Sequence, residues 1–168
     1  MSITQEQREM CEFLIQNRDV LDSLINETAN DLKERAVEIV KDEKGYHFTK
    51  TRIGGNWGVT INQNMKTLFH THPPYDRKYH EPIDPGFSPK DIRAAMISEA
   101  TIFCLGEKID GENVITCRLG DPKLQKEILN GPWKNWYADE LFEAVTRTCE
   151  CSGCDPKTGR LPPAMKKK

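Results

Sequence analysis

The sequence Thr67-Leu68-Phe69-His70-Thr71-His72-Pro73 carries the central signal of this chain. Its apolar and β-branched start predicts a strand that runs into the two histidines. Residues i and i+2 of a strand point to the same face, so His70 and His72 can present two imidazoles to one point. Neutral imidazole is a preferred zinc ligand, and a catalytic zinc site needs three protein ligands and one open position. The stretch therefore predicts a metal centre, although a lone His-x-His on a surface is usually a coincidence.

Ser88-Pro89-Lys90-Asp91 is the second informative stretch. A capping hydroxyl comes first, a proline occupies the first helical position, and a carboxylate the third, which predicts a helix start. Asp91 could supply the third metal ligand, but Ser-x-x-Asp alone is usually only a capping box. Between the two stretches, residues 73–86 contain four prolines and predict a long loop of the kind that is often functional.

Hydrophobic periodicity predicts a mixed chain of helices and strands on either side of these stretches. The expected helices are residues 5–33, with Asn17 to Asp19 as a candidate interruption, a helix opened by Ser88, 124–129 and 133–145. The expected strands are 36–40, 46–53, 57–61, 67–69, 101–106 and 111–119. The last two should pair across an Asp110-Gly111 turn. This order predicts an α/β or α+β domain with a mixed sheet flanked by helices.

Composition bounds the classes of protein that fit. The chain has 168 residues and 19.3 kDa, so we expect a single domain over residues 1–148 and a Cys-containing, Pro- and Lys-rich tail over 149–168. We predict that the tail is poorly ordered from Ser152. The formal net charge of −2 argues against a nucleic-acid or membrane-surface protein. The first twenty residues are too polar for a signal peptide, and no apolar run approaches the roughly 18 residues that a membrane span needs, so we expect a cytoplasmic protein.

The combination His70-x-His72-Pro73, a gap, then Ser88-x-x-Asp91 resembles the signature of the JAB/MPN (JAMM) zinc metalloproteases. The resemblance covers roughly residues 20–120 and is closest to archaeal or bacterial single-domain members. It implies an MPN/JAB-like (cytidine-deaminase-like) mixed sheet flanked by helices. It also implies hydrolysis of isopeptide or peptide bonds at the C-terminus of ubiquitin or a ubiquitin-like protein, which would be the partner.

The same resemblance implies a role for each site residue. His70, His72 and Asp91 would hold one catalytic Zn²⁺, which lowers the pKa of its water. The Ser88 hydroxyl would stabilise the oxyanion. An upstream glutamate would act as general base. Glu34 lies directly before the apolar run 36–40 and is the favoured choice, with Glu38 inside the run as the alternative.

The chain departs from the family pattern between His72 and Ser88, where residues 73–87 form a longer spacer than is usual. A longer flexible loop is cheap, because doubling its length costs only about 0.6 kcal/mol. His80, Glu81 and Asp84 of this insertion could contact substrate or metal, or simply be solvated. The insertion leaves the metal ligands unchanged and bears more on substrate preference.

Six cysteines form two groups. Cys11, Cys104 and Cys117 lie in apolar surroundings and are interpreted as core residues. Cys149, Cys151 and Cys154 crowd together and offer three thiolates, one fewer than a closed tetrahedral zinc site needs. Cys104, Cys117 or a cysteine of another chain could complete a second, structural Zn²⁺ site. A disulfide and three free thiols are the alternatives.

Three rival functions are consistent with parts of the pattern. A catalytically silent MPN scaffold or binding module is disfavoured because the ligand set is intact. A zinc hydrolase acting on a small amide stays open, since the motif specifies water activation and not the substrate. A small nucleic-acid-binding protein that uses the Cys-rich tail is disfavoured by the charge and by the lack of interleaved basic and aromatic residues.

Overall fold

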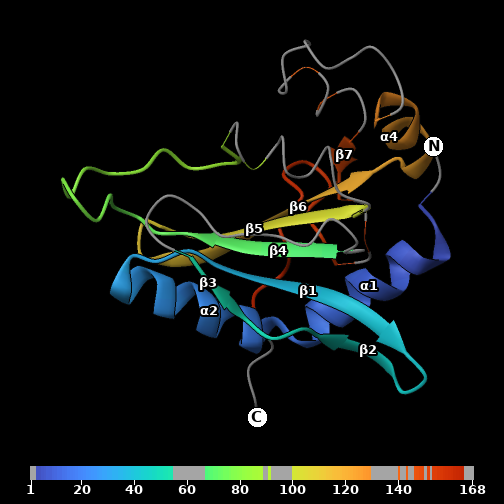
Figure 1. Cartoon of the computed structure of the whole chain (residues 1–168), viewed down its shortest axis with the longest axis horizontal. Helices are drawn as coiled ribbons and strands as arrows, with labels where there is room; N and C mark the ends of the chain where they lie inside the picture. Colours follow the sequence, from blue (N-terminus) through green and yellow to red (C-terminus); the bar gives the residue numbers. More distant parts are fainter. Residues whose placement is uncertain are drawn as a thin grey trace.

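A computed structural model describes residues 3–54, 67–88, 91, 100–129, 140, 143, 146–149, 151 and 153–164. Within them the chain forms one mixed, largely antiparallel sheet with two helices against one of its faces (Figure 1). The predicted mixed α+β class is confirmed. Three predicted elements fall wholly or largely outside the described residues, namely the strand 57–61, the helix that follows Ser88 and the helix 133–145.

The N-terminal helical region consists of two helices, α1 (Gln5–Gln16) and α2 (Arg18–Asp31). Thr4 begins α1 with a reciprocal capping box, because its hydroxyl accepts from the Gln7 amide N–H and the Gln7 side chain accepts from the Thr4 N–H, both at 3.0 Å. Asn17 ends α1 by donating its side-chain amide to the carbonyl of Phe13 at 2.8 Å. The predicted interruption at Asn17 is therefore confirmed.

The strands are β1 (Arg35–Asp42), β2 (Gly45–Phe48), β3 (Arg52–Ile53), β4 (Thr67–His72), β5 (Ile102–Ile109), β6 (Glu112–Gly120) and β7 (Thr146–Thr148). Their order is β2-β1-β4-β5-β6-β7, and β3 also pairs with β1. β4 and β5 run parallel, and the other pairs are antiparallel. The expected single strand 46–53 is wrong: it is split into β2 and β3.

The β5–β6 hairpin has the two-residue turn that its sequence predicts. Asp110 and Gly111 both have positive φ angles, 51° and 80°, and Ile109 pairs with Glu112 across them. Asp-Gly tolerates this left-handed pair of conformations, so the predicted hairpin is confirmed. After β6 the chain enters α4 (Pro122–Leu129), as predicted for 124–129.

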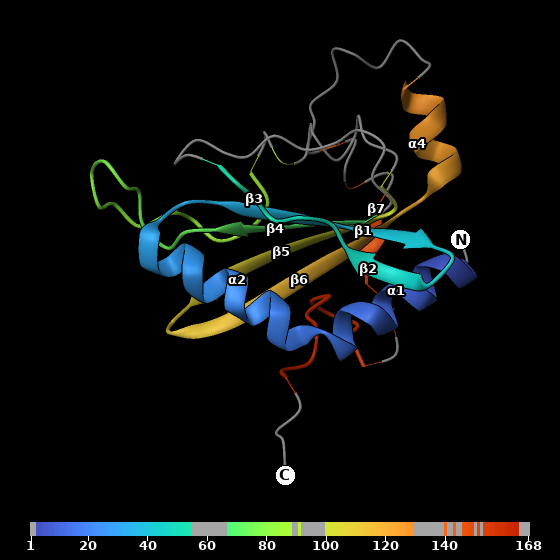
Figure 2. The same ribbon diagram turned by 60° about the horizontal axis from the view of Figure 1, so that its bottom comes forward.

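The core lies between the sheet and the pair α1 and α2 (Figure 2). Alternate residues of each strand face these helices, so that Phe69 of β4 packs there with Ile25 of α2. Gly106 of β5 lets the helix approach, since a Cβ at this position would lie 2.7 Å from the Phe69 ring and 2.8 Å from Ile25. The opposite face of the sheet is left for the residues of the candidate site.

The C-terminal segment does not match the prediction of a poorly ordered tail. The N–H of Leu161 donates to the carbonyl of Ile115 in β6 at 2.9 Å, and the side chain of Leu161 is buried. The buried Arg18 guanidinium donates to the carbonyls of Leu161 and Pro162 at 3.2 and 2.7 Å. Composition alone missed these specific partners, which hold the segment on the helical side of the sheet (Figure 2).

Among the helices that the structure describes, none combines the length and the apolar character needed to cross a membrane.

Gly106→Ala should destabilise the fold, because the added methyl group overlaps the fully buried side chains of Phe69 and Ile25. Overpacking a core typically costs about 1–3 kcal/mol of unfolding free energy. Chemical denaturation measures this loss. Ile25→Val in the Gly106→Ala background should recover part of it, although Ile25→Val alone is destabilising. Strictly additive losses would show that the two side chains do not compete for the same space.

Candidate metal centre

Strand β4 presents its two histidines on the face of the sheet opposite to α1 and α2. Thr71, between them, points toward α2, where its hydroxyl lies 2.6 Å from that of Thr28. Strand alternation then directs His70 and His72 to the other face. Both are buried, with 4% and 6% of their surface exposed, and their ring centroids are 5.0 Å apart. The structure thus brings the two imidazoles together as the His-x-His spacing predicts.

Asp91 joins the two histidines from a different part of the chain. Its Oδ2 atom lies 3.2 Å from Nε2 of His70 and 2.7 Å from Nε2 of His72. The three residues offer their ligand atoms within 4.8 Å of one another. Two imidazole nitrogens and one carboxylate oxygen therefore converge on one point, as the sequence pattern predicts for a metal centre.

Ser88 holds Asp91 in this orientation through a reciprocal cap. The Ser88 N–H donates to Oδ2 of Asp91 at 2.9 Å, and the Asp91 N–H donates to the Ser88 hydroxyl oxygen at 3.2 Å. The predicted capping box is thus present. The cap uses a lone pair of the Ser88 hydroxyl and leaves its hydrogen available for donation, since a hydroxyl has one donor and two acceptor sites.

The two candidate glutamates have different surroundings. Glu34 directly precedes β1, and its Oε1 atom lies 3.4 Å from Nε2 of His72. Glu38 lies inside β1, opposite Leu68 in the register with β4, and its carboxylate forms an ion pair with Arg52 at 3.1 Å. The structure therefore places Glu34 at the edge of the centre and gives Glu38 a cationic partner.

Burial and charge act in opposite directions on the ionisation of the centre. Burial disfavours the carboxylate of Asp91, but the facing His70 and His72 outweigh it and hold the pKa of Asp91 well below its usual range. Burial likewise disfavours protonated His72, yet its hydrogen bond with Asp91 and the nearby carboxylates raise the pKa of His72 overall. Without metal, the centre therefore favours an ionised Asp91, and His72 keeps its proton to a higher pH than an ordinary histidine does.

The donor set and its burial fit a metal ion. Within the described part of the chain, the two ring nitrogens of His70 and Nδ1 of His72 form no hydrogen bond although they are buried. A buried ring nitrogen that makes no hydrogen bond is costly, and Nε2 of His70 has only its 3.2 Å contact with Asp91, so a metal bound to this atom would remove part of that cost. Imidazole nitrogens together with a carboxylate oxygen are typical ligands of zinc.

Glu107 is a buried carboxylate at the site that sequence reasoning missed. It pairs with His72 in the parallel register of β4 and β5, and its two oxygens accept from the Gly86 N–H at 3.2 Å each. Burial raises the pKa of Glu107. The hydrogen bond from Gly86 and the nearby histidines act in the opposite direction but do not outweigh burial. Only the strand register, which no local pattern specifies, could have placed Glu107 opposite His72.

The insertion between His72 and Ser88 folds back on itself and is anchored beside the centre. Tyr75 forms an isolated β-bridge with Pro82, and the Phe87 ring lies 6.0 Å from the His70 ring. The loop extends past the end of β4 (Figure 1). The three titratable residues singled out in the sequence are solvent-exposed in it, namely His80, Glu81 and Asp84.

Cys149, Cys151 and Cys154 lie on the other side of the sheet. There they meet Cys11 of α1, which sequence reasoning assigned to the core and not to the cluster. Cys11 is indeed buried, so its apolar neighbours masked its second role. Cys104 and Cys117 are buried as predicted. They form a disulfide between paired positions of β5 and β6.

Comparison with known proteins yields no family model that matches the chain and no curated protein with significant sequence similarity. The chemistry assigned to the centre rests on the residues themselves. Their types, distances and burial are sufficient to design tests of metal binding.

The centre should bind about one zinc ion per chain through His70, His72 and Asp91. The double variant His70→Ala/His72→Ala, and separately Asp91→Ala, should lose that zinc because each removes ligand atoms that converge on one point. His80→Ala is the matched control, since His80 is an exposed histidine of the adjacent loop. Elemental analysis of the purified proteins measures the stoichiometry. Zinc content equal to wild type in both ligand variants would refute the site.

The stabilisation by zinc should grow with pH. A raised pKa of His72 means that its protonation stabilises the metal-free fold below about pH 6.5, and this contribution is lost as pH rises through the raised value. Zinc needs the neutral imidazole, so protons compete with it at low pH. The Tm gain on adding zinc should be larger at about pH 8 than at about pH 6. An equal or smaller gain at the higher pH would contradict the assignment of His72.

Proposed function

We propose that the protein is a zinc-dependent metallopeptidase of the JAB/MPN type that hydrolyses isopeptide or peptide bonds at the C-terminus of a ubiquitin-like protein. The convergence of His70, His72 and Asp91 on one point carries the proposal. The flanking positions of Glu34 and Ser88 supply the remaining groups that such chemistry needs. The mixed α+β sheet is compatible with an MPN/JAB-like fold, which is part of the same proposal.

Zinc, when bound, would supply a Lewis acid that polarises the scissile carbonyl and acidifies a water molecule. His70 and His72 would hold it through Nε2, the atoms that face Asp91. The cap from Ser88 keeps the Asp91 carboxylate aimed at the histidines, so little ordering is required when the metal binds.

Glu34 is the proposed general base. Its Oε1 atom is 3.4 Å from Nε2 of His72, close enough to reach a water molecule at the centre without being one of the three converging ligands. The carboxylate would accept a proton from the attacking water and deliver it to the leaving amine. Glu34 lies immediately before β1, which is the strand that pairs with β4.

Ser88 is the proposed oxyanion donor. Its hydroxyl accepts the Asp91 N–H in the helix cap, which leaves the hydroxyl hydrogen to donate to the carbonyl oxygen of the substrate. Removing one such donor typically costs about 10²–10³-fold in rate. The cap itself would fix the direction of the hydroxyl oxygen before substrate arrives.

The loop between His72 and Ser88 supports a protein substrate rather than a small amide. Tyr75, Tyr79 and Ile83 are exposed on it, with 48%, 63% and 36% of their surface accessible. Several large, exposed hydrophobic side chains on one loop are a feature that a protein partner could use. Both ends of this loop lie at the centre, so a partner bound to it would place its chain end near His70 and His72.

Glu34→Gln tests the proposed function most directly, because it removes the proton acceptor and keeps the size of the side chain. Zinc content should be unchanged, while hydrolysis of a ubiquitin-like protein fused through its C-terminus to a reporter should fall roughly 10²–10⁴-fold. Glu38→Gln is the matched control and should keep activity near that of the wild type. A dead Glu38→Gln with a fully active Glu34→Gln would exchange the two assignments.

Two further variants separate the metal from the chemistry. Ser88→Ala should keep zinc and lose about 10²–10³-fold in rate, whereas Asp91→Ala should lose both zinc and activity. The Ser88→Thr variant retains a hydroxyl and a helix cap, and should recover part of the rate. Hydrolysis that persists after the zinc is removed by a chelator would exclude the peptidase proposal.

A further inference from the structure

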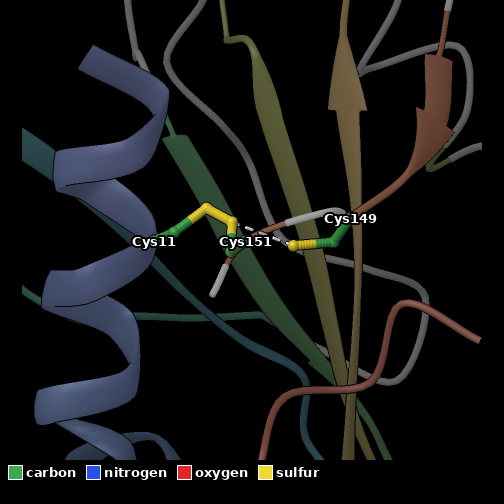
Figure 3. A group of neighbouring side chains, drawn as sticks. All are labelled: Cys11, Cys149 and Cys151. Carbon is green, nitrogen blue, oxygen red and sulfur yellow. Dashed lines mark hydrogen bonds between the residues drawn. A yellow bond between two sulfur atoms is a disulfide. The ribbon is translucent and has the colours of Figure 1, made fainter. Parts of the chain in front are cut away.

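Four of the six cysteines meet at a single place on the helical side of the sheet. The sulfur of Cys149 lies 3.0 Å from that of Cys151 and 3.0 Å from that of Cys154. The sulfurs of Cys151 and Cys11 are joined as a disulfide, whereas Cys149 and Cys154 are free thiols. Figure 3 shows Cys11 reaching from α1 toward Cys151, with Cys149 on the opposite side of Cys151. The four sulfurs therefore form one connected group.

Distant parts of the chain supply these thiols. Cys11 lies on the buried face of α1, and Cys149 follows β7 directly, with its N–H donating to the Cys117 carbonyl at 3.2 Å. Cys151 and Cys154 bracket a tight turn in which the Cys154 N–H donates to the Cys151 carbonyl at 3.0 Å. Gly153 adopts the positive φ of 95° that this turn needs. The sulfurs of Cys11, Cys149 and Cys151 lie within 4.8 Å of one another, and the turn brings the Cys154 sulfur to within 3.0 Å of that of Cys149.

We propose that after a thiol reductant opens the Cys11–Cys151 disulfide to two thiols, Cys11, Cys149, Cys151 and Cys154 form a closed four-thiolate site for a structural zinc ion. Four cysteine ligands saturate the tetrahedral preference of Zn²⁺ and leave no position for water, so such a site stabilises structure and does no chemistry. The site is independent of the proposed peptidase activity, because the His70 and His72 imidazoles occupy the opposite face of the sheet.

The arrangement of the sulfurs favours a shared metal over disulfides. A disulfide joins each sulfur to one partner and accounts for Cys11 and Cys151, but the sulfur of Cys149 is equally close, at 3.0 Å, to those of Cys151 and Cys154. Zinc–sulfur bonds of about 2.3 Å at tetrahedral angles separate the sulfurs by about 3.8 Å. The two contacts of Cys149 would thus widen by about 0.8 Å around the ion.

A zinc ion here would fasten the C-terminal segment to the N-terminal helix. Cys11 and Cys151 are 140 residues apart in the sequence, so the ion would close a loop of chain that contains the strands β1 to β7. Arg18 and Leu161 hold the same segment by hydrogen bonds and burial. Metal bound in the folded state alone adds its binding free energy to folding.

Zinc counting on the reduced full-length protein tests the proposal. Wild type should carry two zinc ions, and His70→Ala/His72→Ala should carry one. Cys11→Ser and Cys154→Ser should each lose the other zinc and lower Tm while the His70 site stays loaded. Cys104→Ala is the matched control, a buried cysteine of the same core outside the cluster, and should keep both ions. Retention of both ions in Cys11→Ser would overturn the proposal.

Measurements on wild type keep the test valid where a variant does not fold. A mercurial thiol reagent should release one zinc that a chelator alone leaves bound, and cobalt in that site should show the charge-transfer absorption of thiolate ligands. One zinc in total, all of it chelator-accessible, would overturn the proposal. A mass deficit of two hydrogens per bond in the unreduced, denatured chain would identify disulfides in its place.

Discussion

The hydrogen bond between the hydroxyls of Thr71 and Thr28 is the constraint on which the candidate site depends. It ties the middle of β4 to α2, and the Arg35 N–H donates to the same Thr71 hydroxyl at 2.9 Å. Because Thr71 faces the helices, strand alternation directs His70 and His72 to the opposite face. A slip of one residue would turn the imidazoles toward α2 and Thr71 to the opposite face. The candidate metal centre therefore requires the observed register of β4.

Arg35 extends this constraint to the start of β1, where Glu34 lies. Its guanidinium is buried and pairs with Asp31 at 2.6 Å and with Glu27 at 3.2 Å, both on α2. The hydrogen bond from Arg35, helped by the Lys33 backbone N–H and the nearby positive charges, outweighs burial and lowers the pKa of Asp31 to about 2. The end of α2, the start of β1 and the middle of β4 are thereby fastened together. Glu34 is carried to the edge of the centre as a consequence of this packing.

The sheet separates two places where metal-binding residues gather. On one face, the nitrogen and oxygen donors of His70, His72 and Asp91 could hold a metal ion. On the other, the sulfurs of Cys11, Cys149, Cys151 and Cys154 lie between the sheet and α1. The two groups of donor atoms are thus kept apart by the sheet. The same tertiary packing that buries Cys11 and Cys151 also orders a C-terminal segment whose composition suggested disorder.

Features that depend on neighbours in the chain could be predicted from the sequence. The His70-x-His72 spacing, the cap between Ser88 and Asp91 and the Asp110-Gly111 hairpin follow from the local geometry of strands, helix starts and turns. Which distant residues meet at these places depends on how the whole chain folds. Glu107 faces His72, and Cys11 joins the late cysteines, through strand register and helix packing. Local spacing sets the direction of a side chain, whereas the distance between segments is set by how the whole core packs, which no short stretch encodes.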